Sequence, residues 1–165
     1  ARGRIAAIGD AACQVFPAHG SGIGPGLIAA RTLADALAEG ADPATYALRW
    51  QRAEGGLLAC HDVFRRLAQT FAPEDISGLM RAGLMDAEVA AATLGQRFGR
   101  PRPSALPAKA LGLARHPALT RRLAGAAARM AAVGALYARY PHREAALPGW
   151  SRSVARLFGE APDPG

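Results

Sequence analysis

The chain has 165 residues, enough for a domain with a sizeable core, and half of them are hydrophobic. The formal charge is +7, and every Lys or Arg position except Lys109 is an arginine, which is typical of a bias in composition. The sequence has no block of like charges interleaved with aromatic residues, so we expect no specific nucleic-acid surface. Cys13 and Cys60 lie far apart, which is typical of a reducing compartment, and arginines interrupt every apolar run before it could span a membrane. We therefore expect a cytoplasmic protein with no transmembrane segment, whose only membrane contact would be peripheral.

The first predicted element is a short buried strand over Arg4–Ile8, followed closely by an acid, Asp10. Ligands collect at the carboxyl ends of strands in open α/β sheets, so this carboxylate is well placed to bind one. The glycines within 20–26 let the backbone approach a ligand without a Cβ in the way, and Pro25 suits the first turn of a helix. The start of that helix would offer free N–H groups to an anionic or electron-rich group.

Two familiar phosphate-binding motifs do not fit this stretch. No Lys-Ser or Lys-Thr pair follows the glycines, as a Walker-type loop requires. The third glycine of the dinucleotide-binding fingerprint is replaced by Pro25 when the pattern starts at Gly20, and by Leu27 when it starts at Gly22.

A different signature is carried by an acid and a set of small residues at fixed spacing: Gly9, Asp10, Pro17, Gly20, Ser21, Gly22 and Ile23. This order resembles the second flavin-binding motif of FAD-dependent oxidoreductases with the para-hydroxybenzoate hydroxylase fold. That group includes aromatic hydroxylases, flavin halogenases and geranylgeranyl reductases. The resemblance covers roughly residues 1–40, and Cys13 departs from it, since relatives often have Gly or a polar residue there.

The resemblance implies a role for each part of the motif. Asp10 would accept a hydrogen bond from a ribityl hydroxyl of FAD, and the turn over 17–23 would lie under the isoalloxazine edge. Backbone N–H groups near Gly22 and Ile23 would face N1 and the C2 carbonyl of the flavin. The helix that follows would then stabilise negative charge on the reduced cofactor.

The fold class follows from the scarcity of strands. A lone strand leaves its backbone N–H and C=O groups unpaired, so we expect a mostly α chain that is the C-terminal portion of an α/β FAD-binding fold. The sheet and a Gly-x-Gly-x-x-Gly motif would lie in the upstream remainder of the protein, and this fragment would not bind FAD by itself. We expect residues 1–40 to complete the FAD-binding domain, 41–160 to form a helical region and 161–165 to be a disordered tail.

Several helices are predicted after the glycine turn. The first ends at Gly40 and carries one apolar face: Ile23, Leu27, Ala30, Ala34 and Leu37. Asp42-Pro43 begins a long helix whose apolar residues alternate in steps of four and three: Tyr46, Trp50, Ala53, Leu57, Cys60, Phe64, Leu67 and Phe71. Further helices are predicted over 73–83, 87–94, 106–114 and 117–140, and a terminal helix within 143–158.

Few side chains qualify for chemistry beyond the flavin motif. Core packing is the first interpretation of the Phe residues of the long helix, and the secondary one is that Leu57, Phe64 and Phe71 wall a lipid-sized pocket, as in a reductase-like enzyme. His19 could protonate a substrate carbon or stabilise reduced flavin, and Cys13 could face the substrate as a thiol. The alternatives are a solvent-facing loop histidine and a small buried hydrophobe. The histidines show no metal-ligand spacing, so no metal site is predicted.

The resemblance therefore implies an FAD-dependent oxidoreductase, most similar in layout to geranylgeranyl reductases, which reduce isoprenoid double bonds with electrons from NAD(P)H or another donor. A flavin-dependent monooxygenase or halogenase is the nearest alternative. From another class of protein, a non-catalytic, basic helical interaction module is the alternative, and it predicts a protein that carries no flavin.

Overall fold

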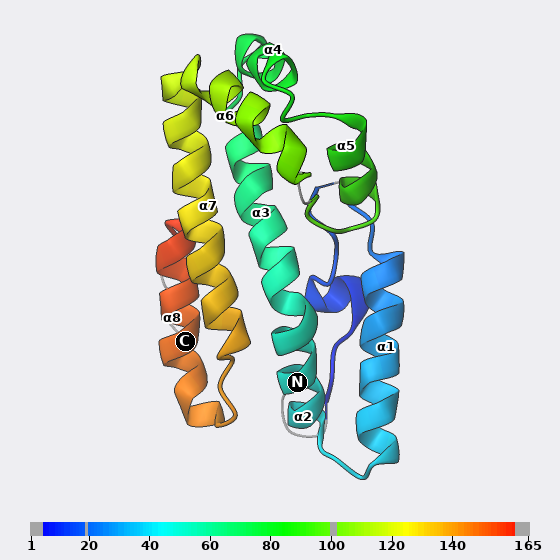
Figure 1. The fold of residues 1–165 in the computed structure, drawn as a ribbon. Helices are drawn as coiled ribbons and strands as arrows, with labels where there is room; N and C mark the ends of the chain where they lie inside the picture. Colours follow the sequence, from blue (N-terminus) through cyan, green and yellow to red (C-terminus); the bar gives the residue numbers. More distant parts are fainter. Residues whose placement is uncertain (1–4, 19, 100–101, 161–165) are drawn as a thin grey trace. The chain divides into compact units, whose positions relative to one another are not determined.

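The computed structural model describes residues 5–18, 20–99 and 102–160, and over these residues the chain is mostly α-helical (Figure 1). The predicted mostly α class is therefore confirmed. The predicted strand at Arg4–Ile8 is wrong for its described part, because residues 5–8 form no strand and Ile5 is 74% exposed. No described strand lies beside this segment to pair with its backbone groups. The predicted tail, 161–165, lies outside the described residues.

Two compact units make up the chain. The first contains Ala1–Val63 and Arg129–Gly165, and the second contains Phe64–Ala128. The domain boundary predicted at residue 40 falls inside the first unit. None of the helices in the described part of the chain is both long enough and apolar enough to cross a membrane.

Helix α1 (Ile23–Ala38) is the first α-helix of the first unit, and it packs on α2 (Pro43–Trp50). Its buried residues are small, with Ala29 and Ala36 fully buried against Tyr46 and Trp50. Small side chains allow two helices to approach closely, so this alanine face forms the contact. The start of α2 is the predicted one, because the Asp42 carboxylate accepts a hydrogen bond from the Thr45 N–H at 2.9 Å.

Leu33 also packs against this cluster, but several other large aliphatic residues of α1 lie on its opposite side. Ile23 is 80% exposed, Leu27 68% and Leu37 54%, so the predicted apolar face of this helix is not the one buried in the first unit. The predicted face was chosen by size and spacing, whereas the contact is made by small residues. A stripe of aliphatic side chains at helical spacing thus remains open along α1.

The long helix predicted after Asp42 is interrupted. A π-helical segment, Gln51–Gly55, separates α2 from α3 (Gly56–Ala68). A π turn holds an extra residue, so the buried face moves on by one position and continues through Gly55, Ala59 and Val63. The predicted continuation through Ala53 is wrong for that reason, and Ala53 is exposed.

The other helices of the first unit are the second half of α7 (Pro117–Ala138) and α8 (Leu147–Phe158). Trp150 of α8 makes edge-to-face contacts with Tyr137 and Tyr140, with ring centroids 5.0 and 4.9 Å apart. Its indole N–H also donates to the Leu136 carbonyl at 3.0 Å. These contacts dock α8 on α7, as predicted for a terminal helix.

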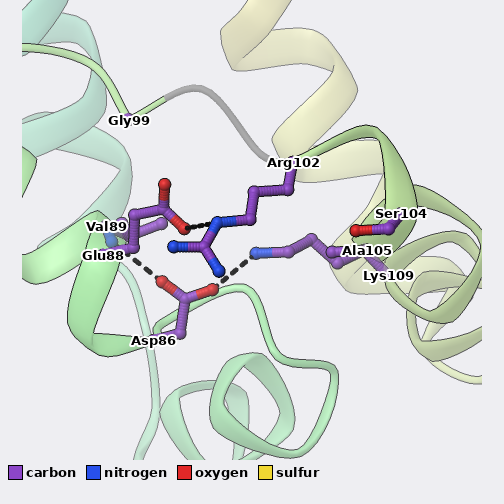
Figure 2. Close-up of a pocket in the computed structure, with 8 residues that line it drawn as sticks. All are labelled: Asp86, Glu88, Val89, Gly99, Arg102, Ser104, Ala105 and Lys109. Atoms are coloured by element: carbon purple, nitrogen blue, oxygen red, sulfur yellow. Dashed lines mark hydrogen bonds and ion pairs between the residues drawn. The ribbon is translucent and has the colours of Figure 1, made fainter.

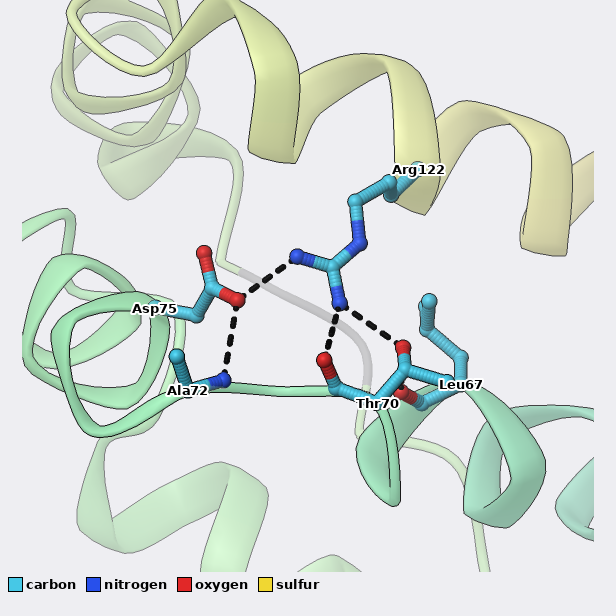
Figure 3. A network of polar contacts seen from close by, with 5 residues as sticks. All are labelled: Leu67, Thr70, Ala72, Asp75 and Arg122. Atoms are coloured by element: carbon cyan, nitrogen blue, oxygen red, sulfur yellow. Dashed lines mark hydrogen bonds and ion pairs between the residues drawn. The ribbon is translucent and has the colours of Figure 1, made fainter.

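The second unit contains three short helices whose bounds agree closely with the predicted ones: α4 (Pro73–Arg81), α5 (Ala87–Leu94) and α6 (Leu106–Ala114). Arg122 of α7 holds the turn that precedes α4 (Figure 3). Its guanidinium donates to the Asp75 carboxylate at 2.6 Å and to the Thr70 carbonyl at 2.8 Å, and it lies 4.9 Å from the Phe71 ring centroid. This guanidinium keeps the pKa of Asp75 below its usual value.

Candidate functional site

The residues of the flavin-like motif form two consecutive turns. A 3-10 turn over Gly9–Ala12 is closed by a hydrogen bond from the Gln14 N–H to the Gly9 carbonyl at 3.0 Å. Gly9 has φ +62° and Cys13 has φ +53°, so both adopt the left-handed conformation that this reversal needs. The second turn is closed where the Phe16 N–H donates to the Ser21 carbonyl at 2.9 Å.

A buried side-chain network holds the first turn in place. Gln14 is only 4% exposed, and its amide oxygen accepts from the Gly9 N–H at 2.7 Å. Its amide nitrogen donates to the hydroxyl of Tyr46 at 2.7 Å, and that hydroxyl donates to the Ala7 carbonyl at 3.3 Å. Sequence reasoning misses this function of both side chains: the spacing places Tyr46 only on an apolar helix face, and nothing in it singles out Gln14. The available signal was a lone amide within the apolar run from Cys13 to Phe16.

The second turn brings the start of α1 to Asp10. A Cβ placed on Gly22, the residue before the helix, would lie 2.6 Å from the Asp10 Oδ1 atom. Only glycine lets the carboxylate lie this close to the helix start. No side chain caps the start of α1, so its first N–H groups make no hydrogen bond to a capping side chain, and the positive end of the helix dipole lies at Gly22, next to Asp10.

The predicted flavin contacts are thus gathered rather than scattered. Asp10 and Gly22 are adjacent in space, and Gly9 approaches the first turn of α1, where a Cβ on Gly26 would lie 3.7 Å from the Gly9 Cα. Pro17 and Ser21 are half-buried in the second turn, whereas a Cβ on Gly20 would meet nothing within 4 Å. His19, the predicted proton donor, lies outside the described residues.

If a flavin were bound here, Asp10 would face its sugar-alcohol chain and the start of α1 would face its ring edge. The Asp10 carboxylate is exposed and can accept hydrogen bonds from hydroxyl groups. The uncapped start of α1, at Gly22 and Ile23, can donate to an electron-rich edge. The Asp10 carboxylate itself occupies the space that a Cβ on Gly22 would take, so a ligand would reach this carboxylate from its exposed side.

The other side of the loop borders a cavity of about 230 Å³ within the first unit. Cys13 and Pro17 line it from the loop, and Gln51, Leu58 and Tyr137 line it from the helices. Burial raises the pKa of the Tyr137 hydroxyl, with smaller contributions from Tyr140 and Asp62. Cys13 lines this cavity and is exposed, so the expectation of a small buried hydrophobe at this position is wrong, and a substrate-facing thiol stays a prediction.

The second cysteine differs from Cys13 in its surroundings. The Cys60 thiol donates to the Met130 carbonyl at 3.2 Å, and burial raises its pKa. Because the thiolate is the reactive form, Cys60 is the less reactive of the two, and the exposed Cys13 is the one open to reagents.

The predicted substrate-pocket residues do not line this cavity. Leu57 is half-buried in the first unit, and its neighbour Leu58 lines the cavity instead. Phe64 and Phe71 belong to the second unit, where Phe64 is 39% exposed and Phe71 packs under Arg122. The shift introduced by the π segment explains why a prediction based on regular helical spacing chose Leu57.

Comparisons with protein-family models and with curated proteins identify no family for this chain. No protein-family model matches the chain, and no curated protein matches it. Among the described residues, no three His, Cys, Asp or Glu side chains are grouped so that they could hold a metal ion.

Proposed function

We propose that this chain is the C-terminal, flavin-contacting part of an FAD-dependent oxidoreductase. The observation that supports the proposal is the contact between Asp10 and Gly22, where the carboxylate oxygen lies 2.6 Å from the position of an added Cβ. The motif requires an acid and a glycine-rich helix start to face the same ligand. In the folded chain these two parts, separate in sequence, meet.

The residues of the site have distinct roles in this proposal. Asp10 accepts a hydrogen bond from a ribityl hydroxyl, and the backbone N–H groups near Gly22 and Ile23 stabilise negative charge at the pyrimidine edge of the ring. The Gln14–Tyr46 network orients the turn that carries Asp10. FAD, when bound, supplies the hydride chemistry, with NAD(P)H or another donor as the source of electrons.

The reaction and the substrate class are proposed from the resemblance to the flavin-binding motif described above. We assign the enzyme to the geranylgeranyl reductase-like group, with an isoprenoid carbon–carbon double bond as the group reduced. The cofactor would be held jointly by this chain and the upstream remainder of the protein. The exposed aliphatic stripe of α1, which includes Ile23, Leu27 and Leu37, supports packing of this helix against that remainder.

The first experiment measures flavin content in the purified complete gene product. The unaltered protein should show the visible absorption of oxidised flavin, and Asp10→Ala should lower FAD occupancy. Asp35→Ala is the matched control, because Asp35 is also an exposed acid but lies in the second half of α1, paired loosely with Arg31 at 3.7 Å. A colourless protein, or equal occupancy in both variants, would contradict the assignment.

A second experiment separates reduction from oxygenation. NAD(P)H oxidation is followed with a prenyl diphosphate as the candidate substrate, together with oxygen consumption and mass analysis of the product. A gain of two hydrogens without stoichiometric oxygen uptake supports the reductase. Incorporation of one oxygen atom would instead identify a monooxygenase.

A further inference from the structure

The second unit contains a cavity of about 340 Å³ that the flavin proposal does not use. It lies where the start of α5 meets the 3-10 turn Pro103–Ala105 and the first part of α6. Figure 2 shows the side chains of two cations, Arg102 and Lys109, directed at two carboxylates, Glu88 and Asp86. The formal charges of these four groups cancel, so the cavity selects neither a simple anion nor a simple cation.

One of the two ion pairs is fixed. The Lys109 ammonium lies 2.8 Å from Asp86 Oδ2, and the Lys109 side chain is only 13% exposed. The other carboxylate oxygen of Asp86 accepts from the Val89 N–H at 2.8 Å and caps α5. The hydrogen bond from Lys109 lowers the pKa of Asp86, so this carboxylate stays charged near neutral pH.

The other pair is loose. Arg102 Nε lies 3.4 Å from Glu88 Oε2, and the two side chains are 75% and 50% exposed. Exposed ion pairs contribute little to stability, so these groups can change partners at small cost. Ser104 also lines the cavity and is exposed, so its hydroxyl can reach a ligand. Arg102, Glu88 and Ser104 are thus available to a ligand, while the Lys109–Asp86 ion pair stays in place beside them.

We propose that this cavity binds a free α-amino acid as its zwitterion. The ligand carboxylate accepts hydrogen bonds from the Arg102 guanidinium and the Ser104 hydroxyl, and the ligand ammonium donates to the Glu88 carboxylate. The two charges of an α-amino acid are separated by a single Cα, so they lie roughly 3 Å apart. The Arg102–Glu88 separation of 3.4 Å presents complementary charges at about the same spacing.

The other residues that line the cavity indicate which kind of side chain the bound amino acid carries. Val89, Gly99 and Ala105 form the apolar part of the wall, and none of them carries a polar side chain. A small aliphatic side chain fits such a wall, whereas a charged side chain would have no partner there. This site lies apart from the flavin motif in the sequence and does not depend on the flavin proposal.

The test is calorimetric titration of the complete protein at low ionic strength with L-leucine as the probe. Two analogues serve as matched ligands: 4-methylpentanoate lacks the ammonium, and 3-methylbutylamine lacks the carboxylate. We expect L-leucine to bind with a Kd of about 1 mM or lower, and each analogue to bind at least about tenfold more weakly. Glu88→Gln and Arg102→Gln should each weaken leucine binding by a similar factor.

Glu74→Gln is the control, because Glu74 is an exposed acid at the start of α4 and does not line the cavity. Circular dichroism checks that the variants remain folded, which we expect because the exchanged pair is exposed. Absence of leucine binding up to about 10 mM would overturn the proposal. Equal binding of leucine and 4-methylpentanoate would also overturn it, since that result describes a simple anion site.

Discussion

Replacement of Gly22 by alanine is the most direct test of the proposed flavin site, because it changes the space beside Asp10 while the acid itself is kept. The added Cβ would lie 2.6 Å from Asp10 Oδ1, whereas ordinary contacts begin at 3.4 Å. The carboxylate oxygen must therefore move by about 0.8 Å or turn away. A hydrogen bond from a flavin hydroxyl cannot survive such a shift with good geometry.

The expected magnitudes separate function from stability. Asp10 is exposed and can rotate into solvent, so the loss of folding stability should stay below about 1 kcal/mol, the scale of a glycine-to-alanine change at a helix N-cap. A hydrogen bond to a charged group contributes about 1.5–3 kcal/mol. Its loss should weaken FAD binding roughly 10- to 100-fold.

Gly26→Ala provides the control in the first turn of the same helix. Its Cβ would meet the Gly9 Cα at 3.7 Å, an ordinary contact, and alanine favours the helix by up to about 1 kcal/mol. FAD affinity is measured by titrating apoprotein from the complete gene product and following flavin fluorescence, and stability is measured by urea unfolding. If Gly22→Ala binds FAD as well as Gly26→Ala does, Asp10 is not a flavin ligand.

Two further predictions concern the packing of each unit. Tyr46→Phe should destabilise the first unit by about 1–3 kcal/mol in urea unfolding, because the buried Gln14 amide loses its acceptor; an unchanged midpoint would mean that this bond is unimportant. Gly112→Ala should destabilise the second unit, since its Cβ would lie 2.7 Å from the Cα of the buried Ala82, and overpacking against backbone costs about 1–3 kcal/mol. Gly125→Ala, with nothing within 4 Å of its Cβ, should instead stabilise α7 by up to about 1 kcal/mol, and equal effects of the two changes would contradict the packing described.

The helices could be predicted well where the signal is local. Asp42 and Asp86 each accept a backbone N–H at the start of a helix, and both starts were predicted from an acid at the right position. Pro73 and Pro117 stand at the first position of α4 and α7, where the missing proline N–H costs nothing. Such signals need only a few neighbouring residues, so a sequence contains them in full.

The faces of the helices could not be predicted from spacing alone. The π segment Gln51–Gly55 adds a residue to one turn, and regular spacing then points to the wrong side of α3. In α1 the large residues Ile23 and Leu27 are exposed, while Ala29 and Ala36 are buried. Both errors have a long-range cause, since the neighbour that a face contacts decides which residues it needs.

The candidate site shows the same division between local and long-range causes. The acid and the glycines were found from the motif, because their spacing is fixed by the backbone path of two tight turns. The orientation of the first turn, however, depends on Gln14 and on Tyr46, which belongs to a later helix. A peptide containing only the motif lacks Tyr46 and would leave the Gln14 amide to bond with water. Its Asp10 would then have no fixed position relative to Gly22, so the placement of this carboxylate beside the start of α1 depends on the fold of the first unit and not on the motif alone.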